Sequence, residues 1–169
     1  MVEELTPKER MKIPRQPMPE QPAEERRRNF EEVPLGYSEE DAVREAQRCL
    51  QCRSPKCVEG CPVNVRIPEF IDKVARKDFD GAYDLILETN SLPAICGRVC
   101  PQETQCEERC VLARKGEPVA IGRLERFVAD YMRMKVGEGE RAPLPDETSP
   151  EDAPSVAIVG SGPAGLSCA

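Results

Sequence analysis

The chain has 169 residues, a formal net charge of −7 and no histidine. This balance argues against nucleic-acid binding, because the one basic cluster, at 26–28, is flanked by glutamates and is expected to form a solvated, self-paired face. No segment approaches the ~20 apolar residues that span a bilayer, and the acidic N-terminus is unlike a signal peptide, so we expect a cytoplasmic protein that binds no membrane.

The first third of the chain predicts an arm, a helix and a loop. Residues 1–35 are rich in Pro, Glu and Arg, and we expect an extended arm that lies on other surface. Ser38 and Asp41 form a capping-box pattern, and the helix that follows would deliver Cys49 at its end. Prolines and a glycine predict a loop over 53–66.

Helices are also expected further along the chain. They begin at Pro68, at about residue 80, at residue 103 and at Pro118, with a turn over 90–94. Their apolar residues recur at helical spacing, which is typical of a stripe that faces the core. The helix over 103–114 would carry Cys106 and Cys110 one turn apart.

Cysteine is the most informative residue type. Aromatic residues make up only 4% of the chain and tryptophan is absent, whereas there are nine cysteines. A core with so few large side chains usually needs a covalent or metal staple. Disulfides are rare in a reducing compartment, so cysteines at this density predict bound metal.

Eight of the cysteines fall into two groups. They are Cys49-x2-Cys52-x4-Cys57-x3-Cys61-Pro62 and Cys96-x3-Cys100-Pro101-x4-Cys106-x3-Cys110. Two-cluster ferredoxins use C-x2-C-x2-C-x3-C-P, whose last cysteine binds the other cluster. The first group has this form with a longer middle gap, so Cys49, Cys52 and Cys57 are expected to hold one 4Fe–4S cluster while Cys61 reaches a second. Cys168 lies outside both groups and is expected to be a buried free thiol.

Two other interpretations of the cysteines are weaker. Structural zinc sites use tetrahedral Cys/His sets in paired C-x2–4-C knuckles, whereas this chain has no histidine and a single C-x2-C. A disulfide framework needs an oxidising compartment, for which the sequence carries no signal.

A glycine motif closes the chain. Residues 155–159 predict a short buried strand, and Gly160, Gly162 and Gly165 follow as G-x-G-x-x-G, the dinucleotide-binding pattern. One strand and a helix stub cannot build a pocket, so we expect this chain itself to bind neither FAD nor NADPH. The predicted organisation is an arm (1–35), a helical di-cluster domain (36–135), a linker (136–153) and the start of a truncated Rossmann-like FAD/NAD(P) domain (154–169).

The motifs together resemble a known family. They include Cys49-Leu-Gln-Cys52, Cys96-Gly-Arg-Val-Cys-Pro101, Ile121-Gly-Arg-Leu-Glu-Arg126 and Val159-Gly-Ser-Gly-Pro-Ala-Gly165. The chain resembles the N-terminal region of the small (β) subunit of NADPH-dependent glutamate synthase. The same domain occurs in dihydropyrimidine dehydrogenase and in the large subunit of NADH-dependent reduced ferredoxin:NADP oxidoreductase.

The resemblance implies an all-α domain with two 4Fe–4S clusters. One cluster would be held by Cys49, Cys52, Cys57 and Cys110, and the other by Cys61, Cys100 and Cys106. The fourth ligand of this second cluster would be Glu125, at the position where dihydropyrimidine dehydrogenase has glutamine. Cys96 would be a non-ligand.

The residues alone give Glu125 some support. It shares a helix side with Ile121 and Val128, so its carboxylate should face inward and need a partner. Surface pairing with Arg123 or Arg126 is the alternative.

The implied function is electron transfer. In the parent oxidoreductase, NADPH would reduce FAD, and electrons would pass through the clusters to a large catalytic subunit, as in glutamate synthase. The alternative parent is the large subunit of the electron-bifurcating ferredoxin:NADP oxidoreductase, and an alternative of another class is a structural zinc interaction module. The fragment alone is not expected to be catalytic.

Overall fold

The computed structural model describes residues 5–137 and 154–168. Within these ranges the chain is helical and has no β-strand, only an isolated antiparallel bridge between Glu20 and Pro34. The predicted all-α class is therefore confirmed for the described residues. Among them, no helix has both the length and the apolar content needed to cross a membrane.

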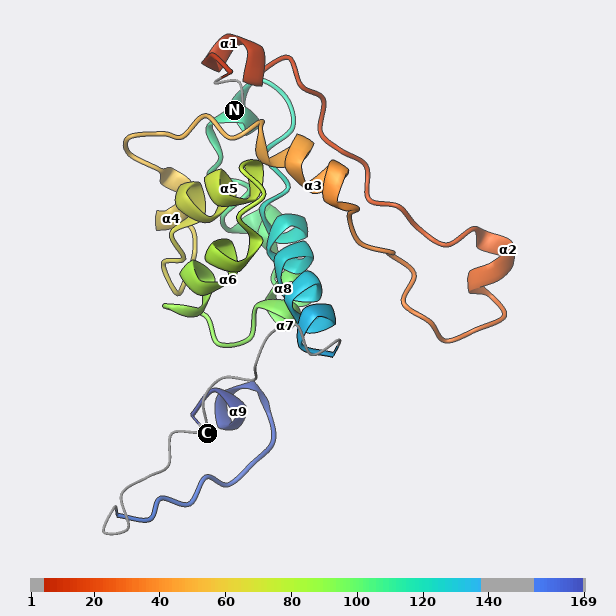
Figure 1. Cartoon of the computed structure of the whole chain (residues 1–169), viewed down its shortest axis with the longest axis vertical. Helices are drawn as coiled ribbons and strands as arrows, with labels where there is room; N and C mark the ends of the chain where they lie inside the picture. Colours follow the sequence, from red (N-terminus) through yellow and green to blue (C-terminus); the bar gives the residue numbers. More distant parts are fainter. Residues whose placement is uncertain (1–4, 138–153, 169) are drawn as a thin grey trace.

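Five helices build the folded body (Figure 1). Helix α8 packs against α7 and α6, α5 packs against α6 and α3, and α8 also touches α3 and α5. Their bounds are α3 Glu39–Ala46, α5 Ile67–Ala75, α6 Phe79–Leu87, α7 Pro93–Val99 and α8 Ile121–Gly137.

The core lies where these helices meet. Phe70, Ile71, Ile86 and Leu124 are almost completely buried in it. Phe79 meets Phe127 edge to face, with 5.1 Å between ring centroids. These few large side chains form one contiguous apolar cluster that also includes Cys49 and Cys106. The cysteine-bearing segments are therefore packed directly on the core.

Several predicted helix starts are confirmed. Ser38 caps α3 and forms a capping box with Asp41. Pro68 lies in the first turn of α5, where its missing N–H costs no hydrogen bond. Helix α8 begins at Ile121, three residues after the predicted start at Pro118; residues 118–120 are not helical.

Three expected elements in the cysteine-bearing part of the chain differ from the structure. Residues 103–114 do not form an α-helix; they contain short 3-10 helices, η1 Gln102–Thr104 and η2 Val111–Arg114, joined by turns. The expected turn over 90–94 runs directly into α7, which begins at Pro93. The loop expected over 53–66 likewise contains the one-turn helix α4, Lys56–Glu59. The cysteines thus lie mostly on tight turns.

The N-terminal arm contains two single-turn helices, α1 Pro7–Arg10 and α2 Ala23–Arg26. Its first part is bound to the helical body. The Tyr37 hydroxyl donates to the Gln16 carbonyl at 2.7 Å, and the Gln16 amide donates to Glu45 at 2.7 Å. From there the chain runs out to α2 and returns to α3 (Figure 1).

The C-terminal described segment departs from expectation. Residues 154–160 are extended but unpaired, and Val156 and Val159 are 83% and 97% exposed. The predicted buried strand is absent from this described segment, because a strand needs a neighbouring strand to satisfy its backbone. Helix α9, Pro163–Cys168, follows, and Cys168 is exposed, which corrects the expectation of a buried thiol.

Candidate metal centre

A first cavity of about 30 Å³ is surrounded by four cysteines. Three come from the first sequence group and one from the second: Cys49, Cys52, Cys57 and Cys110. The remaining wall is mainly apolar and includes Leu50, Pro68 and Val119, together with Lys56 and Arg109. No carboxylate lines this cavity, so sulfur is its anionic donor.

Local backbone geometry brings these four thiols together. Gln51, between Cys49 and Cys52, adopts a left-handed conformation (φ 52°) that a regular helix or strand does not contain. Helix α4 carries Cys57, and Cys110 precedes η2. The arm fixes the start of this turn, because Arg10 donates from Nη1 to the Cys49 carbonyl at 2.9 Å.

A second cavity, of about 120 Å³, contains a different donor set. Its sulfur donors are Cys61, Cys96, Cys100 and Cys106, and its one carboxylate is Glu125. Val65, Ile67, Phe70 and Ile121 supply much of the apolar wall. The expectation that Glu125 lies on the same helix side as Ile121 matches this arrangement, since both side chains line the cavity.

Glycines allow the elements around the second cavity to approach closely. A Cβ on Gly97 of α7 would lie 2.6 Å from the backbone nitrogen of Arg126 in α8, which no side chain could tolerate. A Cβ on Gly60 would similarly lie 2.7 Å from the Gln105 carbonyl. The cavity therefore depends on backbone contacts that only glycine permits.

Glu125 is held by a partner that the sequence did not reveal. Asn90, which is buried in the connection between α6 and α7, donates from Nδ2 to Glu125 Oε1 at 2.6 Å. Burial raises the pKa of Glu125 to about 7, although the Asn90 hydrogen bond lowers it in part. No pattern in the sequence marks Asn90, because it gains this role only when the connection between α6 and α7 lies against α8.

The thiols influence one another in the same two sets. Burial, together with the charges of neighbouring thiols that include Cys110, raises the pKa of Cys49 to about 12 and that of Cys57 to about 11. Burial also raises the pKa of Cys106 to about 12, with further contributions from Glu107, Cys61 and Glu125. Neighbouring thiolates repel one another, so each set needs a bound cation before all its sulfurs can ionise.

These donor sets fit iron–sulfur clusters. Cysteine thiolates are the usual ligands of such clusters, and each cavity gathers sulfur atoms from segments far apart in the sequence. Within the described residues, no three His, Cys, Asp or Glu side chains converge as they would around a single metal ion. In a cubane cluster each thiolate binds a different iron, so its ligands surround a volume.

The other predicted site residues lie elsewhere. Gly160 has a positive φ of 118°, and Gly165 of α9 lies so close to the Gly160 carbonyl that a side chain there would collide with it. This is the local turn that the G-x-G-x-x-G pattern requires. Residue 169 and the linker residues 138–153 lie outside the described part of the chain.

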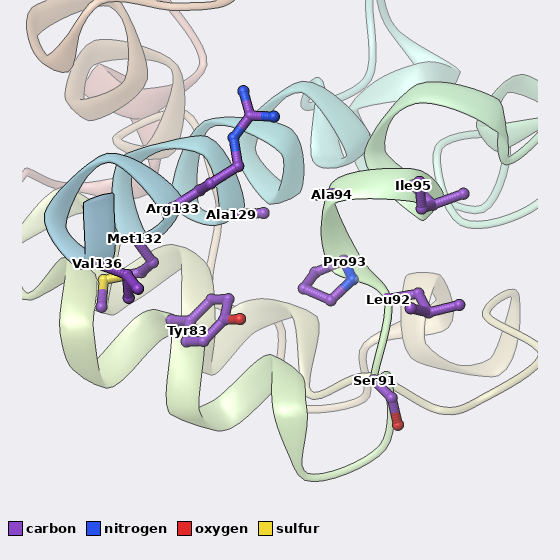
Figure 2. A pocket seen from close by; sticks show the side chains of 10 residues that line it. All are labelled: Tyr83, Ser91, Leu92, Pro93, Ala94, Ile95, Ala129, Met132, Arg133 and Val136. Carbon is purple, nitrogen blue, oxygen red and sulfur yellow. The ribbon is translucent and has the colours of Figure 1, made fainter. Parts of the chain in front are cut away.

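A further cavity of about 340 Å³ contains no cysteine or carboxylate among its lining residues. Figure 2 shows Tyr83 of α6, Pro93 of α7 and Met132 of α8 around it, with Arg133 extending away. Its mainly apolar lining offers no donor set for a metal.

Comparison with known proteins gives a consistent result. Residues 26–136 match the family described as dihydropyrimidine dehydrogenase domain II, 4Fe-4S cluster. The chain is 38% identical to the glutamate synthase [NADPH] small chain of Halomonas elongata, over 93% of this chain and 32% of that protein. It is also 38% identical to the NAD-dependent dihydropyrimidine dehydrogenase subunit PreT of Escherichia coli, over 74% of this chain and 29% of that protein. The chain therefore spans about a third of these relatives.

Proposed function

The chain belongs to the family of dihydropyrimidine dehydrogenase domain II, 4Fe-4S cluster, and from this membership we propose that it is a two-cluster electron-transfer module. The observation that carries the proposal is the presence of two separate cysteine-lined cavities in one small helical body. When bound, 4Fe–4S clusters supply one-electron transfer. A module with two of them can conduct electrons between a donor and an acceptor.

Each cavity would hold one cluster. In the first, the ligands are Cys49, Cys52, Cys57 and Cys110, which together line a single cavity. In the second, they are Cys61, Cys100, Cys106 and Glu125. Both cysteine groups contribute to both sites, so the metal would cross-link segments from 49 to 125.

The protein's own residues would set the environment of each cluster. The apolar walls exclude water, which lowers the local dielectric constant and disfavours added negative charge. The chain can also tune the reduction potential of each cluster through three kinds of group: backbone N–H groups, buried thiols and the Glu125 carboxylate.

The longer protein to which such a module belongs is an oxidoreductase. We place this chain with the glutamate synthase small chain, because that relative aligns with 93% of the chain. The parent would use NADPH and FAD, with Gly160, Gly162 and Gly165 opening the dinucleotide-binding domain, and a large catalytic subunit would receive the electrons. The alternative parent, an electron-bifurcating ferredoxin:NADP oxidoreductase, would use the same module with another partner.

Anaerobic purification followed by metal and sulfide analysis tests this function. We expect about eight iron atoms and eight sulfides per chain and a broad absorbance near ~400 nm that dithionite bleaches. A colourless protein with bound zinc would overturn the proposal and favour a structural zinc module.

A further inference from the structure

Asn90 contacts two donor groups of the second cavity at once. Its Nδ2 donates to Glu125 Oε1 at 2.6 Å, and its Oδ1 accepts from the Cys96 thiol at 3.5 Å. The same oxygen accepts from the Leu92 backbone N–H at 3.0 Å, which fixes the side chain at the start of α7. Asn90 therefore joins a carboxylate on α8 to a thiol on α7.

The second cavity has one donor more than a cubane cluster needs. Cys61, Cys100 and Cys106 leave one position for either the Glu125 oxygen or the Cys96 sulfur. Cys96 is adjacent to the others, since it lines the same cavity as these three thiols. The first cavity has no such surplus, because four cysteines and no carboxylate line it.

We propose that Asn90 is the positioning residue that selects Glu125 over Cys96 as the fourth ligand of the second cluster. This inference rests on the proposed two-cluster function and on Glu125 as a ligand. The amide N–H binds Oε1 and so orients the carboxylate, which leaves Oε2 for iron.

The other end of the same amide acts on Cys96. The Cys96 thiol donates to Oδ1, so this hydrogen bond restrains the orientation of the Cys96 side chain, and the sulfur must leave the amide before it can bind iron. Orienting one ligand and restraining its competitor is a role that an aliphatic side chain could not perform.

Two substitutions separate this role from the turn that Asn90 also supports. Asn90→Asp keeps an oxygen for the Leu92 N–H but replaces the donor to Glu125 with a repelling carboxylate. Asn90→Ser keeps a hydroxyl that can accept from the turn but is too short to reach Glu125. Asn29→Asp makes the same chemical change in the exposed arm and is the matched control.

The measurement is alkylation of the full, cluster-loaded chain with iodoacetamide under anaerobic conditions, read by mass spectrometry. In the unsubstituted chain and in Asn29→Asp, we expect Cys96 to be modified while iron is retained. Exposed Cys168 serves as an internal standard. In Asn90→Asp and Asn90→Ser, we expect Cys168 to be modified while Cys96 is protected as an iron ligand. Adding Cys96→Ala to either variant should remove about half of the iron, whereas Cys96→Ala alone should not.

The outcomes distinguish the inference from the function on which it rests. If Cys96 is already protected in the unsubstituted chain and Cys96→Ala loses iron, Glu125 is not the ligand and the site assignment fails. If Cys96 is modified in the unsubstituted chain as expected but also stays reactive in both Asn90 variants, only the role of Asn90 is overturned. Failure of both variants to fold would also overturn it, since Asn90 would then be a structural residue.

Discussion

The first and second cavities are built from the same two cysteine groups, yet they differ in composition and in packing. The first is small, all-sulfur in its donors and held by loops around one-turn helices. The second is larger, contains a carboxylate and a spare thiol, and is lined by residues of α5, α7 and α8 and of the cysteine-bearing loops. Four donors without surplus make a site whose ligands are fixed by sequence spacing, whereas a surplus donor makes ligand choice depend on neighbouring side chains.

If the clusters in both cavities hold the fold together, removal of all the iron should have the largest effect on stability. Anaerobic chelation of iron should abolish the helical circular dichroism in one cooperative transition, because the apolar core is small and the ligands span residues 49–125. The measurement is far-UV ellipticity against chelator concentration. A native-like thermal melt of the iron-free chain would contradict it.

Removal of one thiol from each cavity sharpens the comparison. Cys57→Ala leaves the first cavity with three sulfurs and no replacement, so about half of the iron should be lost. Cys96→Ala leaves the second cavity with four donors, so iron content should stay near that of the parent. Equal iron loss in both variants would show that the two cavities are alike in having no surplus.

The packing around the second cavity can be changed without touching a ligand. Gly97→Ala would force a methyl group against the Arg126 backbone, and overpacking of this kind costs about 1–3 kcal/mol of unfolding free energy. Gly116→Ala is the control, because no atom lies within 4 Å of its added Cβ. Thermal melts of the holoprotein compare the two, and an unchanged melting temperature for Gly97→Ala would mean that α7 and α8 can separate at no cost.

The smallest effect is expected where the arm holds the first cavity. Arg10→Ala removes hydrogen bonds to the carbonyls of Gln47 and Cys49, each worth about 1 kcal/mol net. We expect a slightly lower melting temperature and faster iron release from the first cavity, measured with a coloured chelator. Arg28→Ala, at an exposed position of the same arm, should leave both unchanged.

A buried ion pair shows how the arm joins the rest of the body. Glu45 is fully buried and accepts from Gln16 N, Ala120 N and Arg48 Nη1. Arg48 in turn donates to the carbonyls of Ile13, Glu117 and Pro118. The charges are compensated, as burial requires, and they fix the segment that leads into Cys49.

The sequence alone determined much of this protein. Cysteine spacing and the absence of histidine indicated iron–sulfur clusters, while the N-cap Ser38 and the first-turn residue Pro68 located α3 and α5. These features depend on residues close together in the chain, where one hydrogen bond or one fixed φ is sufficient. The resemblance also proposed the grouping of Cys110 with the first three cysteines, which is the grouping found around the first cavity.

Tertiary structure decided the rest. Residues 103–114 were expected to be helical, but they turn tightly so that Cys106 and Cys110 face different cavities. The strand at 155–159 does not form in the described segment, since pairing needs a second strand. Asn90 touches Glu125 across 35 positions only because the connection between α6 and α7 lies against α8, and no local pattern encodes a contact between segments so far apart.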